Sequence, residues 1–286
     1  MPHDAATPTV EVTIADAASH HEALTALLER HGAHGFRSDE TAFRAYVAAP
    51  NWGDTAVRAV HEWLRAHAPD AALHTRTIAP RNWNAEWEAT VEPQHIGPFF
   101  VRPSWSDATA PSDAYPALVI DPKMSFGTGY HPTTRLVLYL MADVPCEQAH
   151  VLDAGTGTGI LAIAACRAGA ARVDAFDIDT WAVENTRENI AQNDVAERVQ
   201  VHHGPLADLP PASADIVLAN IHRTVLIALM PQFAERLREG GHCICSGCFP
   251  EDAPAMRQAA RDAGLVVARE RTEAPWWAVH FTKPIS

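Results

Sequence analysis

Two glycine-rich segments carry the residues best suited to chemistry. The first, DPKMSFGTGYHPTTRLVL, spans Asp121 to Leu138 and runs from a glycine turn directly into an apolar helical pattern. The second, VLDAGTGTGI, spans Val151 to Ile160 and places three glycines between a strand and a helix. Glycines at such a turn let the backbone lie close against a ligand at the N-terminus of the helix. A glycine loop alone is a weak signal, so the spacing must identify the ligand.

The second segment differs from the usual dinucleotide fingerprint. Its glycines run G-x-G-x-G rather than G-x-G-x-x-G, and they follow Asp153, which would repel a pyrophosphate. The next strand, in AFDID, ends at Asp177, 22 residues after Gly155, where a carboxylate can accept hydrogen bonds from both hydroxyls of a ribose. These features predict a cationic nucleoside ligand, and S-adenosylmethionine fits that description. A solvated acid at the strand end is the simpler alternative.

Asn220 ends an apolar strand in ADIVLANI, so its side chain is expected at the rim where open parallel sheets bind ligands. An amide there can accept a hydrogen bond from an incoming amine and orient it. Methyl transfer from a sulfonium is an in-line displacement that needs a neutral amine and close alignment more than acid-base assistance. We therefore expect Asn220 to position the amine, with no dedicated general base.

His131 is the other candidate for a base, since histidine titrates in a useful range. It precedes Pro132, which is expected to begin a helix. A cap or loop-lining role is the preferred interpretation, because a helix N-terminus lowers the pKa of a histidine without supplying an acid to orient it.

The elements that must position these residues fall into two patterns. Residues 8–80 read as strand, helix, two strands, helix and strand, an order that suggests a ferredoxin-like α+β module. A Trp- and Pro-rich stretch follows, and we expect residues 81–116 to be a linker containing a short helix and an extended connector. Residues 117–286 alternate between strands and helices, which predicts a mainly parallel sheet with helices on both faces and a final hairpin at one edge.

Composition narrows the class of partner. The 286 residues carry 22 Lys and Arg against 35 Asp and Glu, a net charge of -13, which opposes binding to nucleic acid and favours a basic protein or a small molecule. No long apolar run or leader pattern is evident, so we expect a cytoplasmic protein that binds no membrane. The five cysteines are expected to be buried thiols, and despite the cluster HCICSGC we expect no metal site.

The second segment closely resembles the first motif of class I S-adenosylmethionine-dependent methyltransferases. More narrowly, DPKMSFGTGYHPTT, VLDAGTGTGILAIAACRAGA, DIDTWAVENTRENIAQNDV and ADIVLANI, in that order, resemble the PrmA family, the methyltransferases of ribosomal protein L11. The connector NWNAEWEATVEPQHIGPFFVRPSW is also similar to that family's linker. The resemblance is strong over about residues 80–250, whereas the N-terminal module matches in topology more than in motif. Tyr130 and Thr156 are small departures from the family pattern.

The resemblance implies a Rossmann-like methyltransferase domain with a seven-stranded, mainly parallel sheet, and methyl transfer to lysine side-chain and N-terminal amines of ribosomal protein L11. It places cofactor contacts on Thr134, Gly155, Gly157, Asp177 and Asn220. It implies that the N-terminal module grips the protein substrate, and we expect the linker to let this module move and the enzyme to be a monomer.

The two glycine segments then serve two ends of one ligand. Phe126, Gly127 and Gly129 are expected to cover the methionine half of the cofactor. The first turn of the following helix, with Thr134, can bind the methionine carboxylate.

Other functions remain open at this point. The cofactor motifs do not separate methylation of ribosomal protein from methylation of another protein lysine or of a small amine. A non-catalytic ribosome assembly factor with a vestigial site is disfavoured by the intact motifs, and a nicotinamide dehydrogenase by Asp153 and the glycine spacing.

Several further residues receive structural interpretations. Trp83 and Trp87 are expected to pack the linker against a domain, and Asp179 to cap the following helix. His202 and His203 are expected to be surface loop residues.

Overall fold

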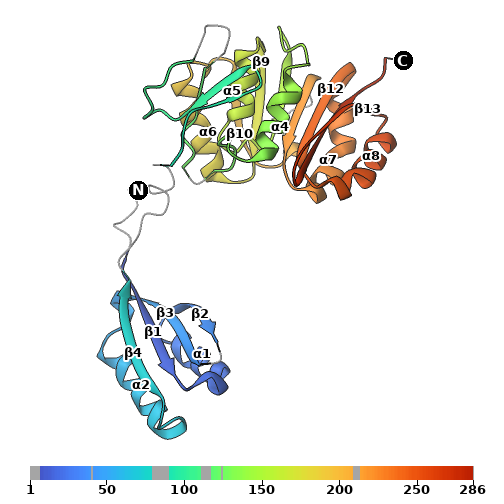
Figure 1. The fold of residues 1–286 in the computed structure, drawn as a ribbon. Coiled ribbons are helices and arrows are strands. Elements are labelled where there is room, and N and C mark those ends of the chain that lie inside the picture. Colours follow the sequence, from blue (N-terminus) through green and yellow to red (C-terminus); the bar gives the residue numbers. More distant parts are fainter. Residues whose placement is uncertain are drawn as a thin grey trace. The chain divides into compact units, whose positions relative to one another are not determined.

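The computed structural model describes residues 7–39, 41–78, 90–110, 117–123, 125–208 and 213–285. The chain divides into two compact units, residues 1–83 and 84–286 (Figure 1). Trp83 and Trp87 lie outside the described residues, so their predicted packing stays a prediction.

The first unit is a four-stranded antiparallel sheet with two α-helices, in the chain order βαββαβ. Its elements are β1 (Thr9–Ala15), α1 (His21–Glu29), β2 (Ala33–Ser38), β3 (Ala42–Ala48), α2 (Asp54–His67) and β4 (Ala72–Ile78), with short 3-10 turns at Ala18–His20 and Ala49–Asn51. The strands lie in the order β2-β3-β1-β4. Alternate residues of β1, such as Val12 and Ile14, are fully buried against helix residues that include Leu24 and Val60. This arrangement confirms the predicted ferredoxin-like module.

The second unit contains a seven-stranded sheet in the order β10-β9-β8-β11-β12-β14-β13, in which β14 runs in the direction opposite to all the other strands. The strands are β8 (His150–Ala154), β9 (Arg172–Asp177), β10 (Val199–His203), β11 (Ala214–Asn220), β12 (Leu237–Cys248), β13 (Val266–Glu273) and β14 (Trp276–Thr282). The helices are α4 (Pro132–Met141), α5 (Ile160–Arg167), α6 (Thr180–Gln192), α7 (Arg223–Arg236) and α8 (Ala253–Asp262), with 3-10 turns at Leu206–Asp208 and Pro250–Asp252. The predicted mainly parallel sheet is confirmed.

Helices cover both faces of this sheet, as the near-continuous apolar strands require. Val151 and Val173 pack with residues of α4, α5 and α6, whereas Leu152 and Phe176 pack with residues of α7 and α8. None of the described helices is long and apolar enough to cross a membrane.

Part of the predicted linker belongs to the core of the second unit. β5 (Gln94–Ile96), β6 (Phe99–Arg102) and β7 (Ala117–Val119) form a small separate sheet. Ile96, Phe99 and Leu118 are buried in the same cluster as Leu136 of α4. Within the predicted connector, Gln94–Ile96 and Phe99–Arg102 are therefore paired strands that pack into this core. Their brevity and the surrounding prolines hid the period-2 pattern that identifies longer strands.

All five cysteines are buried free thiols, as predicted. Cys243 and Cys245 lie on one face of β12, with their sulfur atoms 3.6 Å apart. Burial raises the pKa of Cys146 to about 11 and that of Cys248 to about 12, so these thiols stay protonated. Within the part of the chain that the structure describes, no cluster of histidine, cysteine or acidic residues could hold a metal ion.

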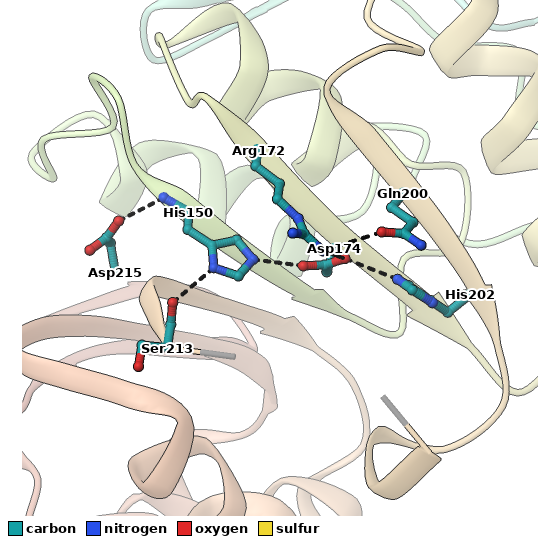
Figure 2. A network of polar contacts seen from close by, with 7 residues as sticks. All are labelled: His150, Arg172, Asp174, Gln200, His202, Ser213 and Asp215. Atoms are coloured by element: carbon teal, nitrogen blue, oxygen red, sulfur yellow. Dashed lines mark hydrogen bonds and ion pairs between the residues drawn. The ribbon is translucent and has the colours of Figure 1, made fainter. Parts of the chain in front are cut away.

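A polar network on three strands surrounds Asp174 (Figure 2). His150 Nε2 lies 2.6 Å from one carboxylate oxygen, and His202 Nε2 and Arg172 Nη2 each lie 3.0 Å from the other. His150 Nδ1 also lies 2.8 Å from the Ser213 carbonyl oxygen. His202 is thus a half-buried strand residue, and its prediction as a surface loop residue is wrong.

The network shifts two pKa values in opposite directions. Burial by itself raises the pKa of Asp174, but the hydrogen bonds from His150, His202 and Arg172 outweigh that effect and hold this pKa well below its usual range. The pKa of His150 is raised, mainly by its hydrogen bond to Asp174. Both ring nitrogens of His150 face hydrogen-bond acceptors. The protonated ring can therefore donate to both acceptors, whereas the neutral ring can donate to only one.

We predict that His150→Gln destabilises the protein in a pH-dependent way. Because the folded pKa of His150 lies above the unfolded value of about 6.5, its contribution is complete below that value and falls as pH rises through the folded pKa. The loss of unfolding free energy should be about 2 kcal/mol at pH 5.5 and clearly smaller at pH 9, as measured by urea denaturation. His203→Gln, on the same strand as His202 but not bonded to Asp174, is the control. An equal loss at both pH values would contradict this assignment.

Candidate functional site

The strand ends that carry the predicted site residues meet at one edge of the large sheet. β8 pairs with β9 and β11 in parallel, so that Ala154 lies opposite Phe176 and Ala219. The residues that follow these three positions are Gly155, Asp177 and Asn220. The structure therefore brings these predicted residues together, because carboxyl ends of adjacent parallel strands lie at the same edge.

The glycine loop after β8 has a conformation that other residues rarely adopt. Gly155 and Gly157 have φ angles of +72° and +59°. A Cβ atom on Gly157 would lie 2.2 Å from the Phe126 carbonyl oxygen, and one on Gly155 would lie 2.3 Å from a methyl carbon of Ile221. The loop is thus closed against neighbouring segments on two sides, and only glycine fits both the angle and the space.

Asp177 is held in place by the backbone. Its Oδ2 accepts a hydrogen bond from the Gly157 amide at 3.1 Å, and its Oδ1 accepts one from the Asp179 amide at 3.0 Å. Each carboxylate oxygen keeps a second lone pair for a ligand hydroxyl. Asp179 accepts a hydrogen bond from the Trp181 amide at 2.9 Å and caps α6, as predicted.

Ile178 offers an apolar surface beside this carboxylate. It directly follows Asp177 and is 75% exposed, which is unusual for a large aliphatic side chain next to a buried strand. The sequence analysis did not single it out, although its position after the strand-end acid was a usable signal.

Asp153 is the buried carboxyl group of the site. Burial raises its pKa to about 7, and the Thr156 hydroxyl and the Ala162 amide oppose that effect. Thr156 Oγ1 donates to Asp153 Oδ2 at 2.7 Å, whereas Oδ1 forms no hydrogen bond of good geometry with any described residue. A buried carboxylate with an unpaired oxygen favours a positively charged ligand nearby, so the residues present fit a sulfonium or ammonium compound.

A hydrogen bond links the first segment to the end of β11. Asn220 Nδ2 donates to Thr134 Oγ1 at 3.2 Å, and Thr134 is fully buried in the first turn of α4. The bond uses a donor of the Asn220 amide, and the oxygen of that amide is the atom that can accept from an amine.

His131 caps α4, as predicted, and the prediction that it is not the catalytic base stays a prediction. Its Nδ1 accepts from the Thr133 amide at 3.3 Å and lies 2.7 Å from the Thr133 hydroxyl. Burial lowers its pKa, and the charge of Arg135 lowers it further. The neutral ring is therefore the form present at neutral pH.

An aromatic group surrounds this histidine. The His131 ring centroid lies 5.0 Å from that of Phe126 and 4.8 Å from that of Trp276, and Trp276 stacks on Phe249 at 4.5 Å. Sequence reasoning missed Phe249 and Trp276. They follow β12 and begin β14, two strands whose antiparallel pairing brings their ends together.

The sheet order, the glycine loop and the acid at the end of β9 define a class I S-adenosylmethionine-dependent methyltransferase. The family profile described as "Ribosomal protein L11 methyltransferase (PrmA)" matches residues 7–284. The chain belongs to this family of ribosomal protein L11 methyltransferases.

Individual relatives are similar over most of the chain. A ribosomal protein L11 methyltransferase of Porphyromonas gingivalis is 36% identical over 270 residues, which cover 92% of this chain and 90% of the relative. One of Pelotomaculum thermopropionicum is 39% identical over 212 residues, 74% of this chain and 68% of the relative. The crystal structure of a ribosomal protein L11 methylase from Lactobacillus delbrueckii subsp. bulgaricus is 28% identical, with a TM-score of 0.63 over 68% of this chain and 99% of that one.

We predict that Gly157→Ala disrupts cofactor binding. A Cβ at this position meets a backbone oxygen at 2.2 Å, so the loop has to move. Affinity for S-adenosylhomocysteine, measured by titration calorimetry, should fall by at least about tenfold. Gly264→Ala is the matched control, because Gly264 also has a positive φ, +80°, but no atom lies within 4 Å of its Cβ position. Equal affinities for the two variants would show that the close approach to Phe126 is not required.

Proposed function

We propose that this enzyme transfers methyl groups from S-adenosylmethionine to lysine side-chain amines and the N-terminal amine of ribosomal protein L11. The observation that carries the proposal is the hydrogen bond between Asn220 and Thr134. Asn220 is suited to orient an amine, and Thr134 lies at the helix N-terminus that is suited to bind the carboxylate of the cofactor. Their hydrogen bond connects these two groups beside the glycine loop and Asp177.

Each part of the cofactor has a group on this chain that suits it. Asp177 accepts hydrogen bonds from the ribose hydroxyls, and the loop at Gly155 and Gly157 lets the backbone approach the ligand. The first turn of α4, with the Thr134 hydroxyl as a donor, receives the carboxylate, because the positive end of the helix dipole attracts an anion. Ile178 supplies apolar surface for the adenine ring. When bound, the cofactor supplies an electrophilic methyl group on a positively charged sulfur.

Asn220 positions the acceptor. Its amide oxygen accepts one N–H of the neutral amine, which fixes the direction of the nitrogen lone pair. With the cofactor held by Asp177 and the glycine loop, the amine nitrogen would bond the methyl carbon as the carbon–sulfur bond breaks, S-adenosylhomocysteine would be the neutral leaving group, and the methylated nitrogen would lose its proton to solvent. Because a lysine amine has an ordinary pKa of about 10.4, the rate should rise with pH as the neutral fraction increases.

The first unit is assigned to substrate recognition. It has its own core and carries none of the proposed cofactor residues. A net charge of -13 on the chain favours a basic protein partner.

The proposal is tested by incubating the enzyme with methyl-labelled S-adenosylmethionine and purified ribosomal protein L11, then mapping the label by mass spectrometry. Methyl groups on lysine and N-terminal nitrogens are the expected result. A mixture of other ribosomal proteins and free lysine serve as competing acceptors. Preferential labelling of one of these acceptors would show that it, rather than ribosomal protein L11, is the substrate. The absence of label on any protein would refute the proposed activity.

A truncated chain, residues 84–286, separates a protein substrate from a small amine. Removing the first unit should abolish labelling of ribosomal protein L11 but leave cofactor affinity unchanged, as measured by calorimetry on a sample shown to be folded by circular dichroism. Undiminished labelling by the truncated chain would show that the first unit does not recognise the substrate.

Asn220→Ala should reduce kcat more than cofactor affinity. Loss of the amide removes the group that aligns the amine, and misalignment at a reacting centre costs about 100-fold in rate. Cofactor affinity should change by less than about tenfold, because the other proposed contacts remain. Gln200→Ala, an exposed amide on β10 outside this edge, is the control. A normal kcat in this variant would show that Asn220 does not align the amine.

A further inference from the structure

Three asparagines form a buried row along α6 and its C-cap residue, Asn193. Asn185, Asn189 and Asn193 are spaced four residues apart, so they lie on one face of the helix. Asn185 is 3% exposed, and Asn189 and Asn193 are fully buried. Burying an amide side chain costs free energy unless it forms hydrogen bonds. The hydrogen bonds of these three residues therefore show what the buried row holds together.

The end of the row anchors β7. Asn193 Oδ1 accepts from the Val119 amide at 2.9 Å, and its Nδ2 donates to the Val119 carbonyl at 2.6 Å. This pair of bonds mimics a backbone ladder and fixes the strand that leads into the first glycine segment.

Asn189 makes a different set of contacts. Its Oδ1 accepts from the Asp121 amide at 3.0 Å, and its Nδ2 donates to the Asp121 carbonyl at 3.1 Å. The same Nδ2 donates to the Thr158 carbonyl at 2.8 Å. A single carboxamide therefore joins the beginning of the first glycine segment to the loop of the second.

Two further hydrogen bonds, both from Thr158, join the second glycine segment to the glycine turn of the first. The Thr158 amide donates to the Phe126 carbonyl at 2.9 Å, and the Thr158 hydroxyl donates to the Gly127 carbonyl. Thr158 is thus bonded to Asn189 on one side and to the first segment on the other. The three connections fix the beginning of the first segment, at Asp121, and its glycine turn, at Phe126 and Gly127, against the second loop.

No other side chain of this size could replace Asn189. A carboxylate in its place would keep the acceptor for the Asp121 amide but would face two carbonyl oxygens without a donor. An apolar residue would remove the acceptor of the Asp121 amide and the side-chain donor to the Thr158 carbonyl in a fully buried site, although the Asp121 carbonyl would keep its hydrogen bond from Asn185.

We propose that Asn189 is a positioning residue for the cofactor, which sets the spacing between the segment that receives the methionine half and the loop that receives the adenosine half. It acts through Asp121 and Thr158 without touching the ligand. The inference rests on the proposed function for the division of the ligand between the two segments.

The test compares Asn189→Ala with Asn193→Ala in the full-length chain. Both remove a fully buried amide from the same helix, but only Asn189 bonds the second loop. Affinity for S-adenosylmethionine, measured by calorimetry well below both melting temperatures, should fall about tenfold or more in Asn189→Ala and by less than about threefold in Asn193→Ala. Similar affinities in the two variants would overturn the proposal.

A ligand fragment distinguishes positioning from general destabilisation. 5′-Methylthioadenosine lacks the amino-acid half, so it needs only the loop and Asp177. Its affinity should change by less than about threefold in Asn189→Ala, because the spacing between segments matters only to a ligand that spans both. An equal loss for the fragment and the whole cofactor would assign Asn189 a purely structural role.

If Asn189→Ala does not fold, Thr158→Val tests the same connection from the other side, because it removes the hydroxyl that bonds Gly127 while keeping the shape of the side chain. The same selective loss of affinity for the whole cofactor is expected, and unchanged affinity would contradict the proposal. Failure of the wild-type protein to bind S-adenosylmethionine would instead refute the proposed function.

Discussion

The Phe126 carbonyl accepts a hydrogen bond from the Thr158 amide and lies directly against Gly157, so the two glycine segments meet in backbone contact. Such an approach is possible only where a side chain is absent from one backbone and the carbonyl of the other finds a donor. The position of the first segment over the carboxyl edge of the sheet depends on this contact. So does the start of α4, which continues the same stretch of chain and carries Thr134.

Three sets of contacts with neighbouring elements support the segments that meet here. β8, β9 and β11 bring Gly155, Asp177 and Asn220 to one edge through their parallel pairing. α6 supports the loops from one face through its buried asparagines. The hairpin of β13 and β14 reaches α4 through hydrogen bonds from Arg135 to Glu273. The site is therefore assembled from helices and strands, and hydrogen bonds from these elements hold its loops.

The acidic side chains of the large sheet have different hydrogen-bond partners at the site and away from it. At the site, the hydrogen bonds that Asp177 accepts from the described residues come from backbone amides, and one oxygen of the buried Asp153 has no hydrogen bond within the same residues, so a cationic ligand nearby would favour the ionised form of Asp153. Away from the site, Asp174 receives hydrogen bonds from two histidines and an arginine and serves to join three strands. Carboxylates of one sheet thus have different roles, because basic side chains bond Asp174, whereas backbone amides and a hydroxyl bond Asp177 and Asp153.

The sequence alone determined the local features: the glycine positions, the acid after β9, the amide after β11, the start of α4 at Pro132 and the parallel sheet. Each depends on neighbours within a few residues, where turn chemistry and hydrophobic period are direct signals. Tertiary structure decided the rest. Asn189 bonds residues 68 and 31 positions away, and Trp276 meets Phe249 only because two strands pair antiparallel. β5 and β6 are too short to identify by pattern, and His202 reaches Asp174 only through strand pairing. These contacts depend on which distant segments pack together, and no local pattern in the sequence specifies that.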